Sequence, residues 1–343
     1  MLSRDRVIAT LNREDTDRIP VTPQVLEHAV RLAGMKISDV FGSSEKFAKA
    51  QLDALEKYKY DGVWAGVVDM YNLLPEALGC QIIVPEDGIP DIKAPIVKQA
   101  KDIDKLFIPD PYKDARLPVA LECIQILHKE VGDEAAVMTG LAGPFAIAGN
   151  LRGVTQIMLD VKSNPSLVKE LCEITTKACE RYGQAILDSG ADVLFLVDAL
   201  AAPALVGPDV WNQIIFPYHQ KLAKKLHQKP IIYHTDLGVH LVLDNASKLD
   251  VNAIEPEDTE DIGKLREMIG EDNVLVGVVG PIPLRSESPE KLKYRVKQII
   301  KQGSSRKGRL IFFTGMVPLD TPFENLKAVV DSVKQFNIQS KRM

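Results

Sequence analysis

Short apolar runs alternate with longer amphipathic segments along most of this chain. Several runs, such as 193–197 and 274–279, have no polar interruption, which is typical of strands buried on both faces. Eight segments have this strand-like character: 18–22, 61–68, 136–141, 192–197, 230–234, 251–254, 273–279 and 309–314. Patterns with helical spacing lie between them, at 45–58, 117–131, 165–189, 209–227 and 289–302. The alternation predicts repeated β–α units around a parallel sheet.

Eight such units predict an α/β fold, a (β/α)8 TIM barrel with an N-terminal helical extension, formed as a single domain over residues 1–343. A doubly wound open sheet has the same local patterns. A Gly-x-Gly-x-x-Gly loop after a strand would favour that open sheet, and the sequence contains none. The proline-rich segment 70–112 interrupts the alternation, so we expect it to form an elaborated loop near the barrel mouth.

Composition narrows the choice of partners and compartment. The net charge is −5 and no block of five like charges occurs, which argues against nucleic acid or an anionic membrane as the main partner. No apolar run approaches the roughly 18 residues that span a bilayer, and the start of the chain lacks the apolar region of a signal peptide. A cytoplasmic protein is therefore expected. The four cysteines form no Cys-x-x-Cys pair and are expected to be buried and free.

Candidate chemistry is sought where strands end, because the working residues of a barrel lie at the carboxyl ends of its strands. These positions give a small polar set: Asp69, Asp198, His234, Asp236, Glu255, Glu257 and Thr314. Carboxylates that converge on one pocket are costly unless they bind a cation, share protons or hold polar groups of a substrate. The sequence thus predicts an acidic site at the carboxyl end of the sheet.

His234 and Asp236 form the most informative pair. If the strand continues through them, residues two apart point the same way, and both side chains can reach one ligand. A His-x-Asp pair suits a divalent metal such as zinc, with Glu255 or Glu257 as the third donor. In the alternative, Asp236 caps the following helix and His234 makes a structural hydrogen bond. The spacing alone leaves both interpretations open.

The remaining polar positions also have a structural alternative. Asp198 directly follows five apolar residues and serves either as a site residue or as a helix cap. Asp69 follows a strand, and Tyr71 is placed to offer an aromatic wall or a hydroxyl group to a substrate. Trp64 is a further candidate for the substrate wall, although packing in the core is its simpler role.

Several stretches resemble the uroporphyrinogen-decarboxylase superfamily, which includes the corrinoid-dependent methyltransferases. They are DRIPV near the start, PEALGCQI, DIDKLFIPDP, LAGPF, LFLVDALA, IIYHTDLG, NAIEPEDTEDIGKL, VLVGVVGP and the closing VPLDTPFENLKAVV. The resemblance therefore extends nearly from end to end. It implies a single (β/α)8 barrel and, commonly, a homodimer.

The chain departs from the decarboxylase branch in one informative place. The resemblance puts Asp69 at the position of the pyrrole-binding aspartate of those enzymes. Their arginine-rich stretch, which pairs with the propionates of the substrate, is replaced here by QVLEHA at 24–29, with only Arg31 nearby. An acidic pocket would repel a substrate that carries eight carboxylates. Decarboxylation of uroporphyrinogen is therefore disfavoured.

A second departure concerns the thiol-methylating branch, which binds zinc through a His-x-Cys pair and a later cysteine. Here the pair reads His234 and Asp236, and the later position falls on Gly315 or Met316. Because both thiolates are missing, activation of a thiol by that design is in doubt. A site of histidine and carboxylates is harder and better suited to polarising an ether oxygen or placing a proton.

The stretches HTD and IEPED resemble the first methyltransferase of aromatic O-demethylase systems. The resemblance implies transfer of a methyl group from an O-methyl donor, a methoxylated aromatic, to the cobalt of a separate corrinoid protein. In this hypothesis His234, Asp236 and Asp198 are catalytic, and His234, Asp236 and Glu255 hold a metal. The residues expected to contact the substrate are Asp69, Tyr71, Trp64 and Glu257.

Three alternatives stay open. The first is methyl transfer from a methylcorrinoid to a thiol or to tetrahydrofolate. The second is a uroporphyrinogen-decarboxylase-like lyase reaction on a carboxylated ring. The third is a barrel that binds a small molecule or a corrinoid partner without turnover.

Overall fold

The computed structural model describes residues 1–85 and 88–336. Seven parallel strands form a curled sheet whose order follows the chain. They are β1 (Gly62–Ala65), β4 (Ala136–Ala142), β5 (Val193–Val197), β6 (Ile231–His234), β7 (Ala253–Glu255), β8 (Val274–Val279) and β9 (Leu310–Thr314). A separate antiparallel pair consists of β2 (Ile82–Ile83) and β3 (Asp91–Ile92).

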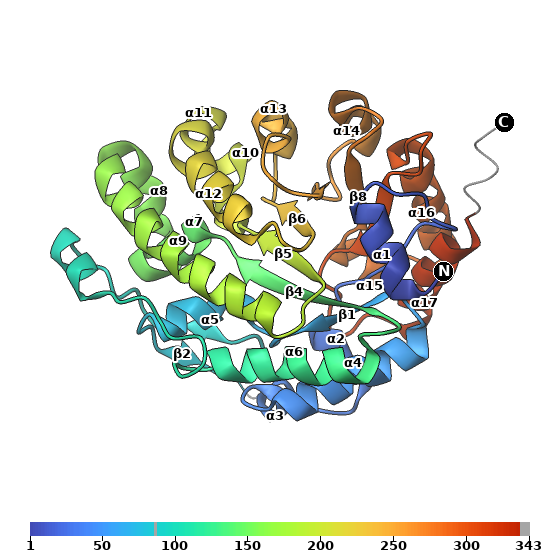
Figure 1. Cartoon of the computed structure of the whole chain (residues 1–343), viewed down its shortest axis with the longest axis horizontal. Helices are drawn as coiled ribbons and strands as arrows, with labels where there is room; N and C mark the ends of the chain where they lie inside the picture. The colour runs from blue at the N-terminus through green and yellow to red at the C-terminus, as the bar shows by residue number, and fades with distance from the viewer. Residues whose placement is uncertain (86–87, 337–343) are drawn as a thin grey trace.

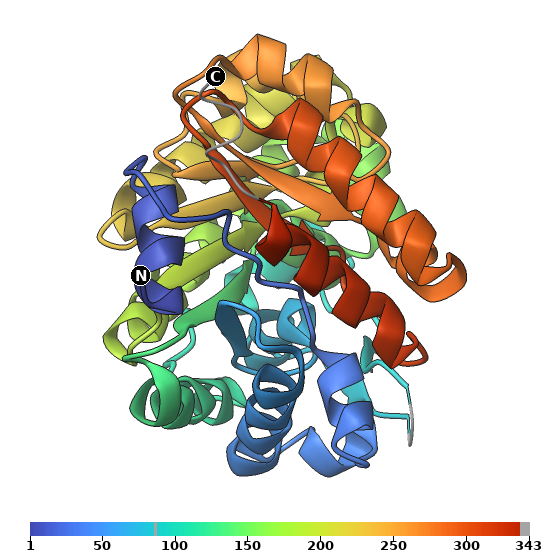
Figure 2. The ribbon, with the colours of Figure 1, turned by 90° about the vertical axis from the view of Figure 1, so that its right-hand side faces the viewer.

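Helices cover the outer face of the curled sheet (Figure 1). The longer ones are α1 (Ser3–Leu11), α4 (Ser44–Tyr58), α5 (Met70–Ala77), α6 (Leu117–Val131), α7 (Pro144–Arg152), α8 (Val154–Ser163), α9 (Pro165–Asp188), α12 (Phe216–Leu226), α14 (Ile262–Ile269), α16 (Pro289–Gly303) and α17 (Phe323–Gln335). The short ones are α2 (Glu27–Leu32), α3 (Ile37–Val40), α10 (Pro203–Val206), α11 (Pro208–Val210), α13 (Leu243–Ala246), α15 (Pro281–Ser286), the 3₁₀ turns η1 (Ala100–Lys105), η2 (Ala199–Ala201) and η4 (Val239–Leu241), and the π-helical turn η3 (Trp211–Ile215). Figure 2 shows α16 and α17 lying side by side. The predicted α/β fold with a parallel sheet is confirmed.

The predicted first strand, 18–22, is reduced to a single parallel bridge between Val21 and Phe312 of β9. Phe312 N donates to Pro20 O at 2.9 Å, and Asp61 N, just before β1, donates to Val21 O at 2.8 Å. Pro20 has no N–H, and Val21 N donates to the Asp61 side chain at 2.9 Å, so the ladder does not extend. The predicted strand is thus found only as this one bridge, although the segment is hydrogen-bonded toward both edges of the sheet.

Aromatic rings meet on the inner face of the sheet. The ring centroid of Trp64 lies 5.5 Å from that of Phe195 and 5.8 Å from that of Phe313, with edge-to-face geometry in both pairs. Trp64 and Phe313 come from the first and last strands of the sheet order, so this contact brings the two edges of the sheet toward each other. Trp64 is only 1% exposed. The structure therefore places it in the packed core and not in the substrate wall.

The N-terminal helix α1 covers the amino end of the sheet. Arg4 forms an ion pair with Asp192 at 2.8 Å, just before β5, and Arg6 forms one with Asp61 at 3.0 Å, just before β1. These buried carboxylates tie the helix to the starts of two strands. The helix α1 is the predicted N-terminal extension, and it leaves the carboxyl end of the sheet open for a functional site.

The segment 70–112 contains more regular structure than the predicted loop, because 70–77 forms the helix α5. Pro75 lies inside this helix and cannot donate to the carbonyl of Tyr71. That carbonyl accepts instead from the side-chain amide of Asn150 at 3.4 Å. The carbonyl of Tyr71, which has no helical N–H donor, thus has a partner far away in the sequence. The proline content of the segment could not predict that the helix is supported in this way.

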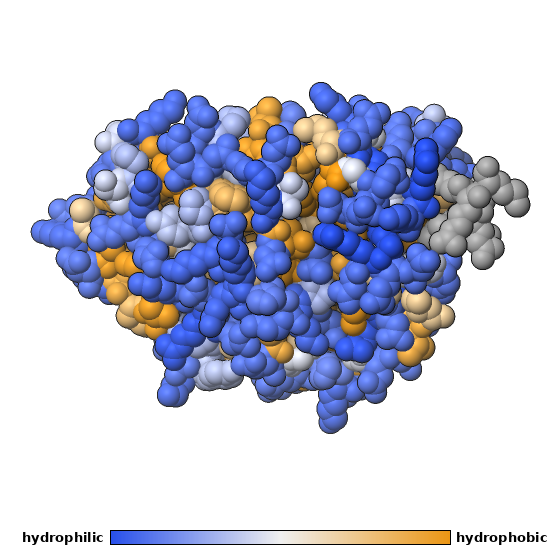
Figure 3. Space-filling model, turned by 45° about the horizontal axis from the view of Figure 1, so that its top comes forward, coloured by the Kyte–Doolittle hydropathy of each residue, from blue (hydrophilic) through white to orange (hydrophobic). Residues whose placement is uncertain are grey.

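Apolar side chains do not form one band on the surface in view. The face shown in Figure 3 is mostly hydrophilic, with apolar residues in separate patches. Within the described residues, no helix is both long enough and apolar enough to cross a bilayer. Cys80, Cys123, Cys172 and Cys179 are all buried and free, so the prediction made for the cysteines is confirmed.

Candidate active site

A cavity of about 220 Å³ lies at the carboxyl end of the sheet. Residues from strand ends and from the loops that follow them form its wall: Gln24, Tyr71, Phe195, His234, Asp236, Glu255, Pro256, Glu257, Val278, Gly280, Pro281, Gly315 and Met316. Five of the predicted site residues are therefore brought together: Tyr71, His234, Asp236, Glu255 and Glu257.

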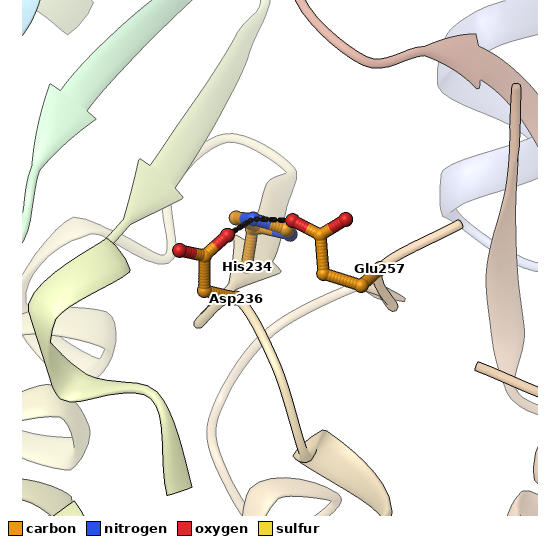
Figure 4. Close-up of side chains that lie close together, drawn as sticks. All are labelled: His234, Asp236 and Glu257. Atoms are coloured by element: carbon orange, nitrogen blue, oxygen red, sulfur yellow. Dashed lines mark hydrogen bonds and ion pairs between the residues drawn. The ribbon is translucent and has the colours of Figure 1, made fainter. Parts of the chain in front are cut away.

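His234 is the centre of the site. It is the last residue of β6 and pairs in register with Glu255, the last residue of β7. Nδ1 of His234 donates to the carbonyl oxygen of Glu255 at 3.1 Å. Because a carbonyl only accepts, this bond places a hydrogen on Nδ1 and turns Nε2 toward the cavity. Nε2 lies 3.4 Å from Asp236 Oδ1 and 3.9 Å from Glu257 Oε1 (Figure 4).

Asp236 reaches this site by a different route from the predicted one. The strand does not continue through it, because β6 ends at His234. Asp236 adopts a left-handed backbone conformation with φ +55°. Aspartate tolerates that region better than most residues, and such conformations are often found at functional sites. The turn still directs the carboxylate to His234. The predicted proximity is found, but the strand argument behind it is wrong.

The carboxylates control the protonation of His234. Burial alone would lower its pKa, but the hydrogen bond to Asp236 and the charges of Glu255, Asp236 and Glu257 together raise the pKa to about 9. The pKa of Asp236 is lowered, because contacts with His234 and Glu257 outweigh the effect of burial. The imidazole is thus held as a cation between acidic groups when nothing else binds there.

The two glutamates have the opposite tendency. Burial raises the pKa of Glu255 to about 8; the charge of His234 opposes this effect, and the charges of Glu257 and Asp236 add to it. Burial and the hydrogen bond with Asp236 raise the pKa of Glu257 to about 7. Both side chains therefore favour the neutral acid more than an exposed glutamate does. Three carboxyl groups lie close together here, so a bound cation would stabilise their ionised forms.

Three donors of this cluster are spaced as metal ligands. One nitrogen of His234 and one oxygen each of Asp236 and Glu257 lie within 4.8 Å of one another. About 3.3 Å separates neighbouring ligands around a tetrahedral zinc with bonds of about 2.0 Å; the 3.4 Å from His234 to Asp236 is close to this value, and the 3.9 Å to Glu257 is longer. The donor set fits a divalent cation, and Glu257 takes the place predicted for Glu255.

Glu255 lies behind this group as a buried acid. It is 3% exposed. Its Oε1 has only a long contact, 3.5 Å, with Gln24 Nε2, and its Oε2 has no hydrogen-bond partner within the described part of the chain. Since Glu255 also forms part of the cavity wall, Oε2 is available to a polar group of a ligand.

Asp198 is not brought to this cavity. Its side chain is fully buried and accepts from the backbone N–H groups of Phe145 and Ala146, in the first turn of α7, at 2.9 and 2.8 Å. It is also hydrogen-bonded to His219 Nε2 at 2.9 Å. These contacts give Asp198 the helix-capping role that the sequence left open, although the helix is not the one that follows it. The geometry does not support its expected catalytic role.

Gly143 should be needed for this arrangement. A Cβ atom at residue 143 would lie 2.3 Å from Asp198 Oδ2, so one of the two groups would have to move. We expect Gly143→Ala to lower the free energy of unfolding by about 1–3 kcal/mol in urea titrations. Gly42→Ala is the matched control, because a Cβ there meets nothing within 4 Å. Equal stability of the two variants would show that Asp198 does not hold α7 in this way.

Asp69 is also placed outside the cavity wall. Its two oxygens accept from Arg116 at 2.8 Å each, and Arg116 donates further to Glu76 at 2.8 Å and lies over the ring of Phe41. Burial raises the pKa of Asp69, and the contact with Arg116 only partly opposes this effect. Asp69 therefore anchors the start of α5. Tyr71, in the first turn of that helix, does line the cavity, as predicted.

Several cavity residues were not found from the sequence. Gln24 and Pro281 carry no charge that would mark them as site residues, and Phe195 is hidden in an apolar strand. Gly315 and Met316 had been noted only as the place where a related enzyme carries a cysteine, and both line the cavity. The comparison with that cysteine was the only sequence feature that pointed to the part of the site after β9.

Comparisons with known proteins agree over nearly the whole chain. A family model described as Uroporphyrinogen decarboxylase (URO-D) matches residues 2–336. Methylcobamide:CoM methyltransferase MtaA of Methanosarcina barkeri is 26% identical, with 95% of this chain and 96% of that protein covered. A uroporphyrinogen decarboxylase of Coxiella burnetii is 25% identical, with 99% and 97% covered. A solved structure of a methyltransferase from Methanosarcina mazei matches with a TM-score of 0.88 and 26% identity, covering 98% of this chain and 99% of that one.

Proposed function

Because the chain belongs to the uroporphyrinogen decarboxylase family, we propose that it is a corrinoid-dependent methyltransferase that transfers a methyl group from a methylcobamide to a thiol. The main support for this proposal is the group formed by His234, Asp236 and Glu257, which is spaced to hold one divalent cation in a cavity at the carboxyl end of the sheet. The thiol hypothesis now stands ahead of the O-methyl hypothesis, because relatives named for methyl transfer between a cobamide and coenzyme M match nearly the whole chain.

The charge of the ligand set supports this choice. One neutral imidazole and two carboxylates carry the same formal charge, −2, as one imidazole and two thiolates. Asp236 and Glu257 thus keep the electrostatics of the zinc site that the resemblance implies, although their oxygens are harder donors than sulfur. A divalent cation bound here would supply Lewis acidity that favours the thiolate form of a bound thiol.

The residues of the chain prepare the site for this reaction. The hydrogen bond from His234 Nδ1 to the Glu255 carbonyl fixes the ring and leaves Nε2 as the donor that faces the cavity. Oε2 of Glu255 can accept a hydrogen bond from the incoming thiol. In the transfer, the sulfur electron pair forms the carbon–sulfur bond, the carbon–cobalt pair returns to cobalt, and the thiol proton is released.

A second candidate is the transfer of a methyl group from an O-methyl donor to cobalt. It is favoured by one observation, the buried carboxyl group of Glu255 with an oxygen that has no partner among the described residues. A protonated carboxyl at this place could donate to the oxygen that leaves from a methyl ether. The methoxylated aromatic remains a prediction from the resemblance.

A decarboxylase reaction on a polycarboxylate is disfavoured by the lining of the cavity. Among the described residues that line it, three are carboxylates, Asp236, Glu255 and Glu257, and none is lysine or arginine. Such a pocket repels a substrate that carries several carboxylates.

The proposal includes the finer predictions made from the sequence. It takes the fold to be a closed (β/α)8 barrel whose first strand is the bridge at Val21, supported by the hydrogen bonds of that segment toward β9 and β1. It also includes a separate corrinoid protein as partner. A homodimer and a cytoplasmic location remain predictions from the sequence.

The activity can be tested with free methylcobalamin. The zinc-loaded protein is mixed with methylcobalamin and a panel of thiols that includes coenzyme M and 2-mercaptoethanol, and the absorption of the methyl–cobalt species is followed under anaerobic conditions. We expect this absorption to fall, with stoichiometric formation of the methyl thioether. A parallel reaction with a cobalt(I) corrinoid and methoxybenzoates tests the second candidate. The proposal would be contradicted if the methyl–cobalt absorption stayed unchanged with every thiol of the panel, in protein with verified bound zinc.

A further inference from the structure

A second cavity, of about 590 Å³, adjoins the active-site cavity. Pro281 and Met316 line both, so the two spaces meet at these residues. The second cavity is mainly apolar, with Ile89, Val317 and Leu319 in its wall. A ligand whose reacting end lies at His234 could therefore place an apolar body here.

One buried acid forms part of this apolar space. Glu27, the first residue of α2, lines the second cavity and is 4% exposed. Its Oε1 has no hydrogen-bond partner within the residues that the structure describes. Burial, together with the charge of Asp69, raises the pKa of Glu27 to about 7. A buried carboxyl oxygen without a donor costs free energy, which a ligand with an N–H group would recover.

The charges around Glu27 define what that ligand can be. Arg31 lies one turn along the same helix and is exposed, at the outer part of the wall. Asp320, on the loop after β9, pairs with Arg285 at 2.7 Å. Asp69 is held by both nitrogens of the Arg116 guanidinium. Among the described residues that line this cavity, Glu27 is thus the buried ionisable group, whereas Arg31 and Asp320 are exposed.

We infer that this second cavity is a binding site for the body of the organic substrate, and that Glu27 recognises a protonated amine on it. The inference rests on the proposed function only in assigning the ligand to the methyl-transfer reaction. The binding itself needs neither metal nor corrinoid. An ammonium group supplies the donor that Oε1 lacks and the positive charge that stabilises the ionised carboxylate.

Benzylamine, benzyl alcohol and benzoate are suitable probes, because they share a ring and differ in charge. Their affinities are measured by titration calorimetry with the full chain, without metal or corrinoid. We expect benzylamine to bind at least about tenfold more tightly than benzoate. In Glu27→Gln its affinity should fall by about tenfold or more, which is the loss of one charge-assisted hydrogen bond. Benzyl alcohol should bind Glu27→Gln and the unmodified chain equally.

Two further variants keep the result interpretable. Leu319→Trp fills the second cavity and should weaken all three probes, whereas Glu290→Gln removes an exposed carboxylate on α16 and should change none. Benzylamine should also bind more tightly as the pH rises through about 7 in the unmodified chain, because Glu27 becomes ionised. This pH dependence should be absent in Glu27→Gln.

The inference is overturned if benzoate binds as tightly as benzylamine, if Glu27→Gln leaves benzylamine affinity unchanged, or if benzylamine does not bind the unmodified chain. None of these results bears on methyl transfer, which is measured with cobalamin and thiols. Conversely, a protein inactive with every thiol can still bind benzylamine, so the two proposals fail separately.

Discussion

Asp236→Asn is expected to lower the rate of methyl transfer to a thiol by about a hundredfold or more, and to weaken zinc binding in parallel. The change removes one of the two carboxylates that face His234 Nε2 and leaves the size of the side chain unchanged. Asparagine also tolerates the left-handed backbone found here, with φ +55°, so the turn should be kept. The measurements are the loss of methyl–cobalt absorption and the zinc content of the purified protein.

The control for this variant is Asp250→Asn. Asp250 is exposed and lies before β7, at the opposite end of the sheet from the cavity. The substitution Asp250→Asn removes the same charge as Asp236→Asn and should leave the rate of methyl transfer and the zinc content unchanged. If Asp236→Asn kept full activity and one zinc per chain, Asp236 would have no part in the site.

Arg116→Met is expected to lower the free energy of unfolding by about 3–5 kcal/mol, which would be the largest loss of stability among the variants considered. Asp69 is 1% exposed at its side chain and would be left in a buried place without its two 2.8 Å donors, either as an unpaired carboxylate or as an acid that must take up a proton. Methionine preserves much of the apolar stem of arginine, so the effect should come mainly from the unpaired carboxylate. Urea unfolding monitored by fluorescence measures the change.

The double variant Arg116→Met/Asp69→Asn separates the charge from the packing. Removing the carboxylate together with its partner should restore a substantial part of the lost stability. A double variant less stable than Arg116→Met alone would show that Asp69 has another role than pairing with Arg116.

The active-site residues found from the sequence share one physical reason. His234 and Glu255 end neighbouring parallel strands that pair in register, so a rule about strand ends is enough to bring them together. Glu257 follows Glu255 by two residues and is carried to the same place. The apolar strands of the sheet and the helices α4, α6, α9, α12 and α16 were predicted for a similar reason, because their patterns are local.

The errors concern residues whose partners lie far away in the sequence. Asp198 also ends a strand, but the backbone of Phe145 and Ala146, more than fifty residues earlier, takes up its oxygens. Asp69 is likewise held by Arg116, which lies 47 residues away. A single sequence shows a carboxylate at a strand end but does not show whether a distant donor already binds it. The same limit explains Trp64, which is enclosed by rings from two other strands.

Gly315, one of the two positions to which the missing cysteine corresponds, is closely packed. A Cβ atom at Gly315 would lie 2.9 Å from Pro281 Cδ, so a longer side chain does not fit there without a shift of the backbone. Glu257 approaches His234 from the other side, on the loop after β7. In the proposed metal site, the third ligand would thus come from the loop after a different strand than in the design that the resemblance implies, and the formal charge of the ligand set would be kept.

The most direct test is anomalous diffraction from crystals equilibrated with zinc, with data collected on both sides of the zinc absorption edge. The account predicts one strong anomalous peak at about 2.0–2.2 Å from His234 Nε2 and from an oxygen of both Asp236 and Glu257. Crystals saturated with zinc that show no peak between these residues, or peaks only at other places, would contradict it.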